Sequence, residues 1–324
     1  MTRSLLLTCN SRSATISIHA YDAKTRQVDH LRQVSLPVPN GEAKASPMAL
    51  SADGALVYVA WRGAENRLLT FALAPAAANL ELLQDRVIAD DICFLHATGD
   101  GTRLLGTGGD SVVGFGLDSQ GLHAEAIPPW QIGPMAHCVM TDRNGRIFAT
   151  ACRGDLLRSI NDSGAVWDLI QPQGCGPRHL CLSPNGKHLY LVTQESGELV
   201  SVSTDGGLHE RQRLTMVDDS NAPMGGDIGI TPDGRFVYAT ERSTNRVVGF
   251  AVEPRGTLRR IGAADAPDYP RAICIGGGGK FLAVLGFRGH RAAIFDIGDD
   301  GALMPAAEFA TGERPSWILT LEAA

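Results

Sequence analysis

A short turn signature that ends in glycine recurs six times along this chain of 324 residues, each time between apolar runs. Its copies, whose last glycines lie 47, 44, 41, 48 and 45 residues apart, are Asp53-Gly54, Asp100-Gly101, Asn144-Gly145, Asn185-Gly186, Asp233-Gly234 and the all-glycine Gly278-Gly279. A period of this length is typical of one four-stranded propeller blade. Asn-Gly or Asp-Gly between apolar runs predicts a hairpin with a type I′ turn, because both central residues of that turn need positive φ. The repeat therefore predicts an all-β propeller.

The two ends of the chain predict how the propeller closes. Residues 5–8 and 15–18 near the N-terminus are typical of the second and third strands of a blade whose first strand is missing. Residues 314–321 near the C-terminus are similar to a first strand, that of residues 269–275, and no partner strand follows them. We therefore predict a seven-bladed β-propeller with four antiparallel strands per blade, whose last blade is closed by both termini, as a single domain over residues 1–324. Such closure removes exposed strand edges.

Composition bounds the partners and the compartment. A net charge of −6 argues against a surface built for nucleic acid or anionic membranes. The seven cysteines contain no Cys-x-x-Cys pair, which favours reduced thiols over a disulfide framework. Only three leucines follow Met1-Thr2-Arg3-Ser4 before polar residues return, so neither a signal peptide nor a transmembrane span is predicted. We expect a cytoplasmic monomer or homodimer with no nucleic-acid and no membrane partner.

Counting along the repeat predicts a ring of side chains on one face of the disc. Each turn joins the innermost strand of a blade to its second strand, so residues eight before and eight after the turn glycine lie at the far end of the blade. Residues at matched offsets point the same way in every blade. The basic residues at these offsets are Arg62, His137, Arg153, Arg178, Arg242 and Arg271. Because a guanidinium holds a carboxylate or phosphate by two hydrogen bonds, arginines gathered in an acidic chain predict an anion site.

The other polar residues near this ring are judged by how far they lie from the position eight residues before or after the turn glycine. Gln194 lies on the ring, whereas Glu195, Asp227 and Glu241 lie one residue away and are reserve candidates. His179 follows Arg178, so it is expected to point to the other face of its strand and to pack against the neighbouring blade. For any single arginine, the alternative is a solvated side chain or an ion pair between blades.

Three segments resemble the seven-bladed lactonase family, which includes bacterial propeller-type 6-phosphogluconolactonases and fungal carboxymuconate lactonizing enzymes. The segments are Gly176-Pro177-Arg178-His179-Leu180 followed by Ser183-Pro184-Asn185-Gly186-Lys187, residues 227–235 followed by Tyr238 and Glu241-Arg242, and Tyr269-Pro270-Arg271. The likeness extends over essentially the whole chain, as far as Pro315-Ser316-Trp317.

The resemblance implies an active site built from a histidine, two arginines and a glutamate. His137, Arg178 and Arg242 match the histidine and the arginines, but Gln194 occupies the place of the glutamate, with Glu195 adjacent. A glutamine cannot accept a proton. Either Glu195 is shifted into position, or His137 acts as the base alone, or the chemistry differs from that of the relatives.

The leading hypothesis is hydrolysis of a sugar or sugar-acid lactone without metal or organic cofactor. His137 would be the base, Arg178 and Arg242 would hold the oxyanion, and the substrate-binding candidates are Arg62, Arg153, Arg271, Asp227 and His179. The expected partner is a small anion, which is a lactone, a sugar phosphate or a dicarboxylate. One alternative is lactonization or isomerisation of a muconate-type acid. The other is a non-catalytic propeller that binds a small anion, since the fold alone does not decide function.

Overall fold

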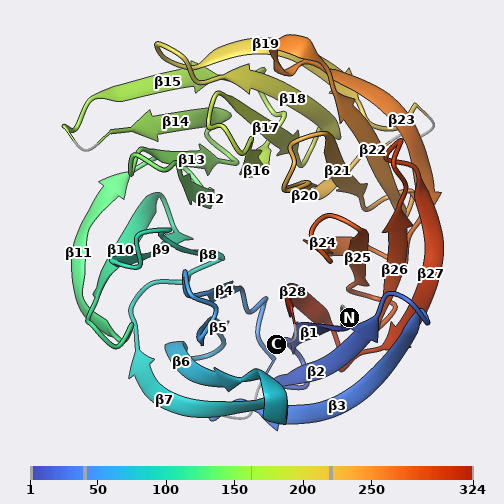
Figure 1. Cartoon of the computed structure of the whole chain (residues 1–324). Coiled ribbons are helices and arrows are strands. Elements are labelled where there is room, and N and C mark those ends of the chain that lie inside the picture. Colours follow the sequence, from blue (N-terminus) through green and yellow to red (C-terminus); the bar gives the residue numbers. More distant parts are fainter. Residues whose placement is uncertain (1–2, 39–41, 162, 219–221, 323–324) are drawn as a thin grey trace.

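The computed structural model describes residues 3–38, 42–161, 163–218 and 222–322, which form seven four-stranded antiparallel sheets around a central axis (Figure 1). From the innermost strand outward, blade 1 contains β4 (Met48–Leu50), β5 (Leu56–Arg62), β6 (Asn66–Ala74) and β7 (Asn79–Val87); blade 2 contains β8 (Phe94–Ala97), β9 (Arg103–Gly108), β10 (Ser111–Leu117) and β11 (His123–Gln131). Blade 3 contains β12 (Ala136–Thr141), β13 (Ile147–Ala151), β14 (Leu156–Ile160) and β15 (Val166–Ile170); blade 4 contains β16 (Pro177–Leu182), β17 (His188–Thr193), β18 (Glu198–Ser203) and β19 (His209–Thr215). Blade 5 contains β20 (Gly225–Ile230), β21 (Phe236–Glu241), β22 (Arg246–Val252) and β23 (Leu258–Asp265); blade 6 contains β24 (Pro270–Gly276), β25 (Phe281–Gly286), β26 (Arg291–Ile297) and β27 (Leu303–Ala310).

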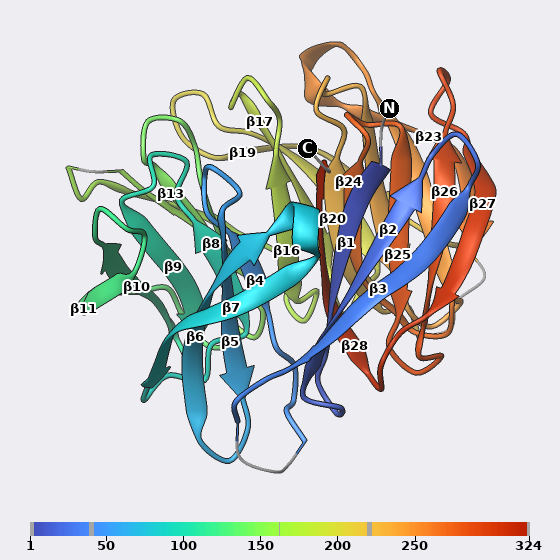
Figure 2. The same ribbon diagram turned by 60° about the horizontal axis from the view of Figure 1, so that its bottom comes forward.

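Blade 7 is assembled from both ends of the chain, as predicted. Its strands, from the axis outward, are β28 (Pro315–Glu322), β1 (Arg3–Asn10), β2 (Thr15–Asp22) and β3 (Gln27–Ser35). The C-terminal strand β28 pairs antiparallel with β1, with Leu7 opposite Leu319. Figure 2 marks both chain ends at the same end of this blade. The prediction of seven blades with a closed ring is confirmed.

The six glycine turns join the innermost strand to the second strand in blades 1 to 6, but the predicted type I′ geometry is wrong. In the five copies with Asp or Asn before glycine, only the glycine has positive φ. In blade 1, Asp53 Oδ1 accepts hydrogen bonds from the Ala55 amide (3.0 Å) and from Ser51 Oγ (2.6 Å). This side-chain contact closes a loop that is longer than two residues, so the acidic residue needs no left-handed backbone.

Neighbouring blades pack through buried side chains at matched positions of their second strands. Tyr58, Tyr190 and Tyr238 are fully buried, each in the middle of such a strand. The hydroxyl of Tyr58 donates to the carbonyl of Gly121 in the next blade (2.7 Å), and Tyr238 does the same to Gly301 (2.8 Å). The repeated tyrosine therefore fills the core between blades, and the hydroxyls of Tyr58 and Tyr238 also bind the backbone of the next blade, whereas the buried Tyr190 hydroxyl has no hydrogen-bond partner.

Helical structure in the described ranges consists of the short 3₁₀ turns η1 (Pro75–Ala77) and η2 (Pro254–Gly256). None of the helices described there has the length and apolar character that crossing a bilayer requires.

Candidate active site

Five consecutive blades, 3 to 7, begin their innermost strand with a β-bulge, which in blade 7 falls at Ser316 of β28. In blades 3 to 6 the pairing register shifts between Ala136 and Cys138, between Pro177 and His179, between Gly225 and Ile228, and between Pro270 and Ala272. The residues left without a strand partner are His137, Arg178, Gly226 with Asp227, and Arg271. A bulge interrupts the alternation of side chains and re-aims the extra residue. The candidate residues of β12, β16, β20 and β24 thus lie at the bulges of these strands.

The bulges of β12, β16 and β24 meet at a cavity of about 470 Å³, whereas Asp227 of the β20 bulge lines a second cavity. Six of the predicted residues line it, namely Arg62, His137, Arg178, Gln194, Arg242 and Arg271. Arg62 ends β5, and Gln194 and Arg242 directly follow β17 and β21. The structure therefore brings together side chains from the first and second strands of separate blades, on one face of the disc.

Three guanidinium groups in this cavity have no carboxylate partner within the described ranges. Arg178 donates from Nη1 to the Gly226 carbonyl (2.6 Å) and from Nε to Gln194 Oε1 (3.2 Å). Arg242 donates to the Gly225 carbonyl (2.5 Å), and Arg271 lies over the Phe287 ring. Carbonyls and rings orient these groups but leave their charge uncompensated.

Burial lowers the pKa of Arg242 to about 9 and the pKa of Arg271 to about 10, and the charge of Arg178 contributes to both shifts. Arg242 and Arg271 therefore stay protonated at neutral pH. The buried Nε of Arg242 also has no hydrogen-bond acceptor in the structure. The cavity thus holds a concentrated positive charge and an unused donor, which is an arrangement that suits an anion.

Arg62 differs from the other arginines because its charge is compensated. Its guanidinium binds Asp91 through two hydrogen bonds of 2.7 and 3.1 Å, and Lys44 Nζ lies 3.0 Å from the same carboxylate. These contacts keep the pKa of Asp91 below its usual range. Arg62 lines the cavity, but its guanidinium already binds the Asp91 carboxylate.

His137 is the imidazole that lines the cavity, with only 7% of its surface exposed. Its Nδ1 is buried without a hydrogen-bond partner. Burial, followed by the charge of Arg178, holds the pKa of His137 well below its ordinary value. The ring is therefore neutral at physiological pH and can accept a proton.

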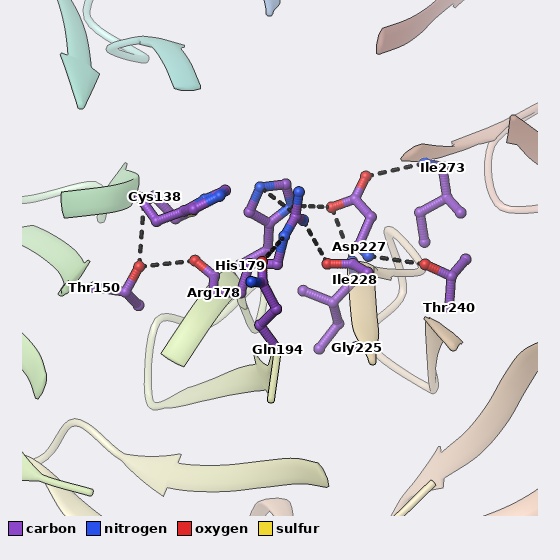
Figure 3. A network of polar contacts seen from close by, with 12 residues as sticks. Cys138, Thr150, Arg178, His179, Gln194, Gly225, Asp227, Ile228, Thr240 and Ile273 are labelled. Carbon is purple, nitrogen blue, oxygen red and sulfur yellow. Dashed lines mark hydrogen bonds and ion pairs between the residues drawn. The ribbon is translucent and has the colours of Figure 1, made fainter. Parts of the chain in front are cut away.

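A second imidazole, His179, lies beneath Arg178 and binds the next blade (Figure 3). Its Nδ1 lies 2.6 Å from Asp227 Oδ1, and its ring centroid lies 5.1 Å from that of His137. The expectation that His179 packs against the neighbouring blade is correct for this contact. However, the bulge at Arg178 also brings the ring to the axis, where it contacts Phe94.

Three rings from blades 2, 4 and 7 form a cluster that contacts His137 through His179. The centroids of Phe94, His179 and Trp317 lie 5.1, 5.2 and 6.0 Å apart. Phe94 and Trp317 line a second, largely apolar cavity of about 380 Å³, whereas Cys93 lines the cationic one. The aromatic cluster therefore lines the apolar cavity through Phe94 and Trp317, and it contacts His137 of the cationic cavity through His179.

Arg153 and Glu195 do not line the cationic cavity, and both side chains are exposed. The first hairpin of blade 3 is one residue shorter than that of blade 4, since Thr141 pairs with Ile147 but Leu182 pairs with Leu189. The ring position in blade 3 is therefore Cys152, and Arg153 lies one residue beyond it.

Two carboxylates considered as reserve candidates have other contacts. Glu195 accepts a hydrogen bond from Gln194 Nε2 (2.6 Å) on the outside of the cavity. Glu241 is fully buried and accepts hydrogen bonds from the backbone and hydroxyl groups of Ser243 and Thr244 and from the Met224 amide. It stabilises the loop that carries Arg242.

Tyr269 is a residue near the site that the offset counting missed. It adopts a left-handed backbone with φ of 58°, and its hydroxyl accepts a hydrogen bond from Arg242 Nη1 (3.2 Å). Its ring lies between the guanidinium groups of Arg242 and Arg288, 5.2 and 4.2 Å from the ring centroid. The available signal in the sequence was the Tyr269-Pro270-Arg271 segment, of which the matched offsets select Arg271 alone.

Two further observations bound the site. Among the residues described, no group of three or more His, Cys, Asp and Glu side chains is placed to hold a metal ion. A larger hollow of about 800 Å³ lies between blades 5 and 6, where Arg291 pairs with Glu308. That hollow contains none of the ring residues, so the cationic cavity is the candidate active site.

Comparison with known proteins agrees with this architecture. The family model described as "Lactonase, 7-bladed beta-propeller" matches residues 115–320. A 6-phosphogluconolactonase of Sodalis glossinidius is 29% identical over 222 residues, which cover 63% of this chain and 66% of that relative, just under two thirds of its length.

Solved structures extend the likeness to the whole chain. A Bacteroides uniformis protein, provisionally assigned as a 6-phosphogluconolactonase, is 25% identical with a TM-score of 0.85 over 99% of both chains. The periplasmic gluconolactonase PpgL of Pseudomonas aeruginosa shares the fold at 20% identity, with a TM-score of 0.87 over 100% of both chains. Together with the family match over most of the blades, these findings show that the chain belongs to the family of seven-bladed β-propeller lactonases.

Proposed function

We propose that this protein hydrolyses a negatively charged sugar or sugar-acid lactone in the cationic cavity. The observation that carries the proposal is the convergence of three guanidinium groups without carboxylate partners on the same cavity as the neutral imidazole of His137. The relatives named as a 6-phosphogluconolactonase and a gluconolactonase support this choice of substrate class.

The reaction needs a base for water and positive charge where the carbonyl oxygen becomes an oxyanion. The water oxygen bonds to the carbonyl carbon while His137 accepts its proton, and Arg178 and Arg242 stabilise the oxyanion. The bond between the carbonyl carbon and the ring oxygen then breaks, and the ring oxygen takes the proton from His137. One lactone and one water give one hydroxy acid, and the imidazole returns to its neutral form.

Gln194 takes part as a hydrogen-bonding residue in this scheme. Its Oε1 accepts from Arg178 Nε (3.2 Å) and its Nε2 donates to Glu195 (2.6 Å). An amide in this position holds the guanidinium without neutralising it. Of the three explanations considered for the missing glutamate, we therefore favour His137 as the base acting alone.

The test is a pH-stat assay of acid release from glucono-1,5-lactone and its 6-phosphate, with wild-type protein and His137→Gln. We expect turnover by the wild type and a fall in kcat of about a hundredfold or more in the variant, since positioned acid–base catalysis contributes on that order. A folded wild-type protein that leaves both lactones at the uncatalysed rate would refute the proposal.

A muconate-type lactonizing activity is the second candidate. The cavity, which four arginines and two aspartates line, also suits a substrate with two carboxylates, because each carboxylate can be held by a guanidinium fork. Loss of ultraviolet absorbance from cis,cis-muconate on addition of the protein, with no acid release from either gluconolactone, would favour this reaction.

A further inference from the structure

The contact between Asp227 and His179 is a buried acid–imidazole pair that the reaction scheme above does not use. The two side chains are 15% and 2% exposed, and they join blade 5 to blade 4 below the arginines. Asp227 Oδ1 accepts from His179 Nδ1 (2.6 Å) and from the Ile228 amide (2.9 Å), and Oδ2 accepts from the Ile273 amide (2.9 Å). The carboxylate is therefore held in one orientation by donors from three directions (Figure 3).

Other carboxylates near the cavity are engaged elsewhere. Asp91 binds Arg62 and Lys44, and Glu241 holds the loop of Ser243 and Thr244. Asp110 accepts from the Met135 amide at the exposed rim. Asp227 differs from these because it binds the imidazole of His179, which in turn contacts Arg178.

The geometry of the pair determines which nitrogen of His179 carries the proton. A carboxylate can only accept, so the hydrogen bond to Asp227 requires the proton on Nδ1. Arg178 Nη1 lies 3.1 Å from Nε2 and 3.1 Å from Nδ1, so the guanidinium contacts the imidazole across its face. The same Nη1 donates to the carbonyl of Gly226, the residue before Asp227. The bulge of blade 5 thus holds Arg178 both directly and through His179.

We propose that Asp227 and His179 are positioning residues, which place the guanidinium of Arg178 where the oxyanion develops. This inference rests on the proposed lactonase function. The carboxylate orients the imidazole, and the imidazole packs against the guanidinium. Neither residue touches the substrate in this arrangement.

The state of Asp227 gives the arrangement a pH dependence. Burial raises the pKa of Asp227 to about 6, although the Ile273 amide and Arg178 oppose the shift. Burial and the neighbouring charges of Arg178, Arg271 and Arg242 hold the pKa of His179 well below its ordinary value. Above pH 6 the pair is therefore a carboxylate and a neutral imidazole. Below pH 6 a protonated Asp227 no longer requires the proton of His179 on Nδ1.

The experiment compares Asp227→Asn with Asp91→Asn in the lactone assay between pH 5 and 8. Each variant removes one negative charge near the arginines, but only Asp227→Asn changes the contact to His179. We expect Asp227→Asn to lower kcat about tenfold or more with KM within threefold of wild type. We also expect the wild-type kcat to fall below pH 6, where Asp227 becomes protonated, and the kcat of Asp227→Asn not to show this fall. Asp91→Asn should instead change KM, because it frees the fork of Arg62.

Two further measurements keep the outcome decisive. Thermal denaturation verifies that both variants are folded, and ¹⁵N spectra of labelled histidines, assigned with His179→Gln, report the tautomer of His179 without turnover. A wild-type His179 protonated on Nε2, or a folded Asp227→Asn protein with wild-type kcat and pH profile, would overturn the inference while leaving the lactonase function intact. A wild-type protein without lactonase activity would instead remove the proposed function.

Discussion

Uncompensated charge at Arg178, Arg242 and Arg271 is the residue-level feature that distinguishes this site from an ordinary surface. Burying a charge without a partner is unfavourable for folding, and the lowered pKa values of Arg242 and Arg271 express that cost. An anionic ligand would supply the missing partner. The same side chains are thus expected to destabilise the empty protein and to bind the substrate.

Replacing Arg271 by methionine tests whether this buried charge lowers the stability of the empty protein while it favours anion binding. We expect Arg271→Met to raise the free energy of unfolding in urea by about 1 kcal/mol or more, because apolar replacements of buried charges are often stabilising. Calorimetric titration with inorganic phosphate should show affinity at least tenfold weaker than wild type. Arg153→Met is the matched control, because Arg153 is exposed and outside the cavity. Equal loss of phosphate affinity in both variants would contradict the assignment of the cavity.

Strands and turns set where these residues lie, and the repeat made most of their positions predictable. Matched offsets from the glycine turn correctly grouped residues from β5, β12, β16 and β24 around the axis, because every blade repeats the same path. The offsets failed for Arg153, since one shorter hairpin shifts the register by a residue. The bulges were not predictable either, because a bulge depends on pairing that single-residue patterns do not encode. Hence the position of His179 at the axis was missed.

The glycine turns offer a test of the same elements. Gly186 has φ of 69° with no atom within 4 Å of an added Cβ, so Gly186→Ala adds backbone strain without a clash. We expect the free energy of unfolding to fall by about 1–2 kcal/mol, the cost of a left-handed residue with a side chain. Gly116→Ala is the control, because Gly116 also has open space but lies in strand β10 without left-handed φ. Urea denaturation measures the free energy of unfolding of both variants. If Gly186→Ala were as stable as Gly116→Ala, the result would argue against a left-handed residue in this turn.

At the scale of the whole molecule, ring closure by β28 and β1 ties the two termini to the site. Trp317 of β28 packs against Phe94 and His179, so closing the propeller completes the cluster of rings that contacts His137. The family match is consistent with this single ring of blades. The cytoplasmic location and the monomeric or homodimeric state stay predictions, which cell fractionation and analytical ultracentrifugation address.

Buried histidines spread over the ring predict that global stability falls in acid. Burial lowers the pKa of His19, His96 and His123 to about 4, whereas an unfolded chain titrates near 6.5. Between pH 6.5 and 4 the unfolded chain binds protons that the folded chain does not, so stability is greatest above pH 6.5 and is lost as pH falls. Asp227 opposes this trend between pH 6 and 4, since its pKa is raised on folding.

Urea denaturation between pH 7.5 and 4.5 measures the effect. We expect a loss on the order of several kcal/mol across this range, since each unit of pKa difference corresponds to about 1.4 kcal/mol. His96→Gln, which keeps a polar group beside Thr141 Oγ1, should give a shallower pH dependence than wild type. A variant with an unchanged slope would show that His96 is not protonated on unfolding in this range.

The most direct test of the arginine-lined cavity as the reaction site is the rate of lactone hydrolysis by Arg178→Met and Arg153→Met, measured side by side on folded proteins. The account predicts that Arg178→Met loses about a hundredfold or more in kcat, as for removal of an oxyanion donor, while Arg153→Met retains the wild-type rate. Wild-type hydrolysis by Arg178→Met, or equal losses in the two variants, would contradict it.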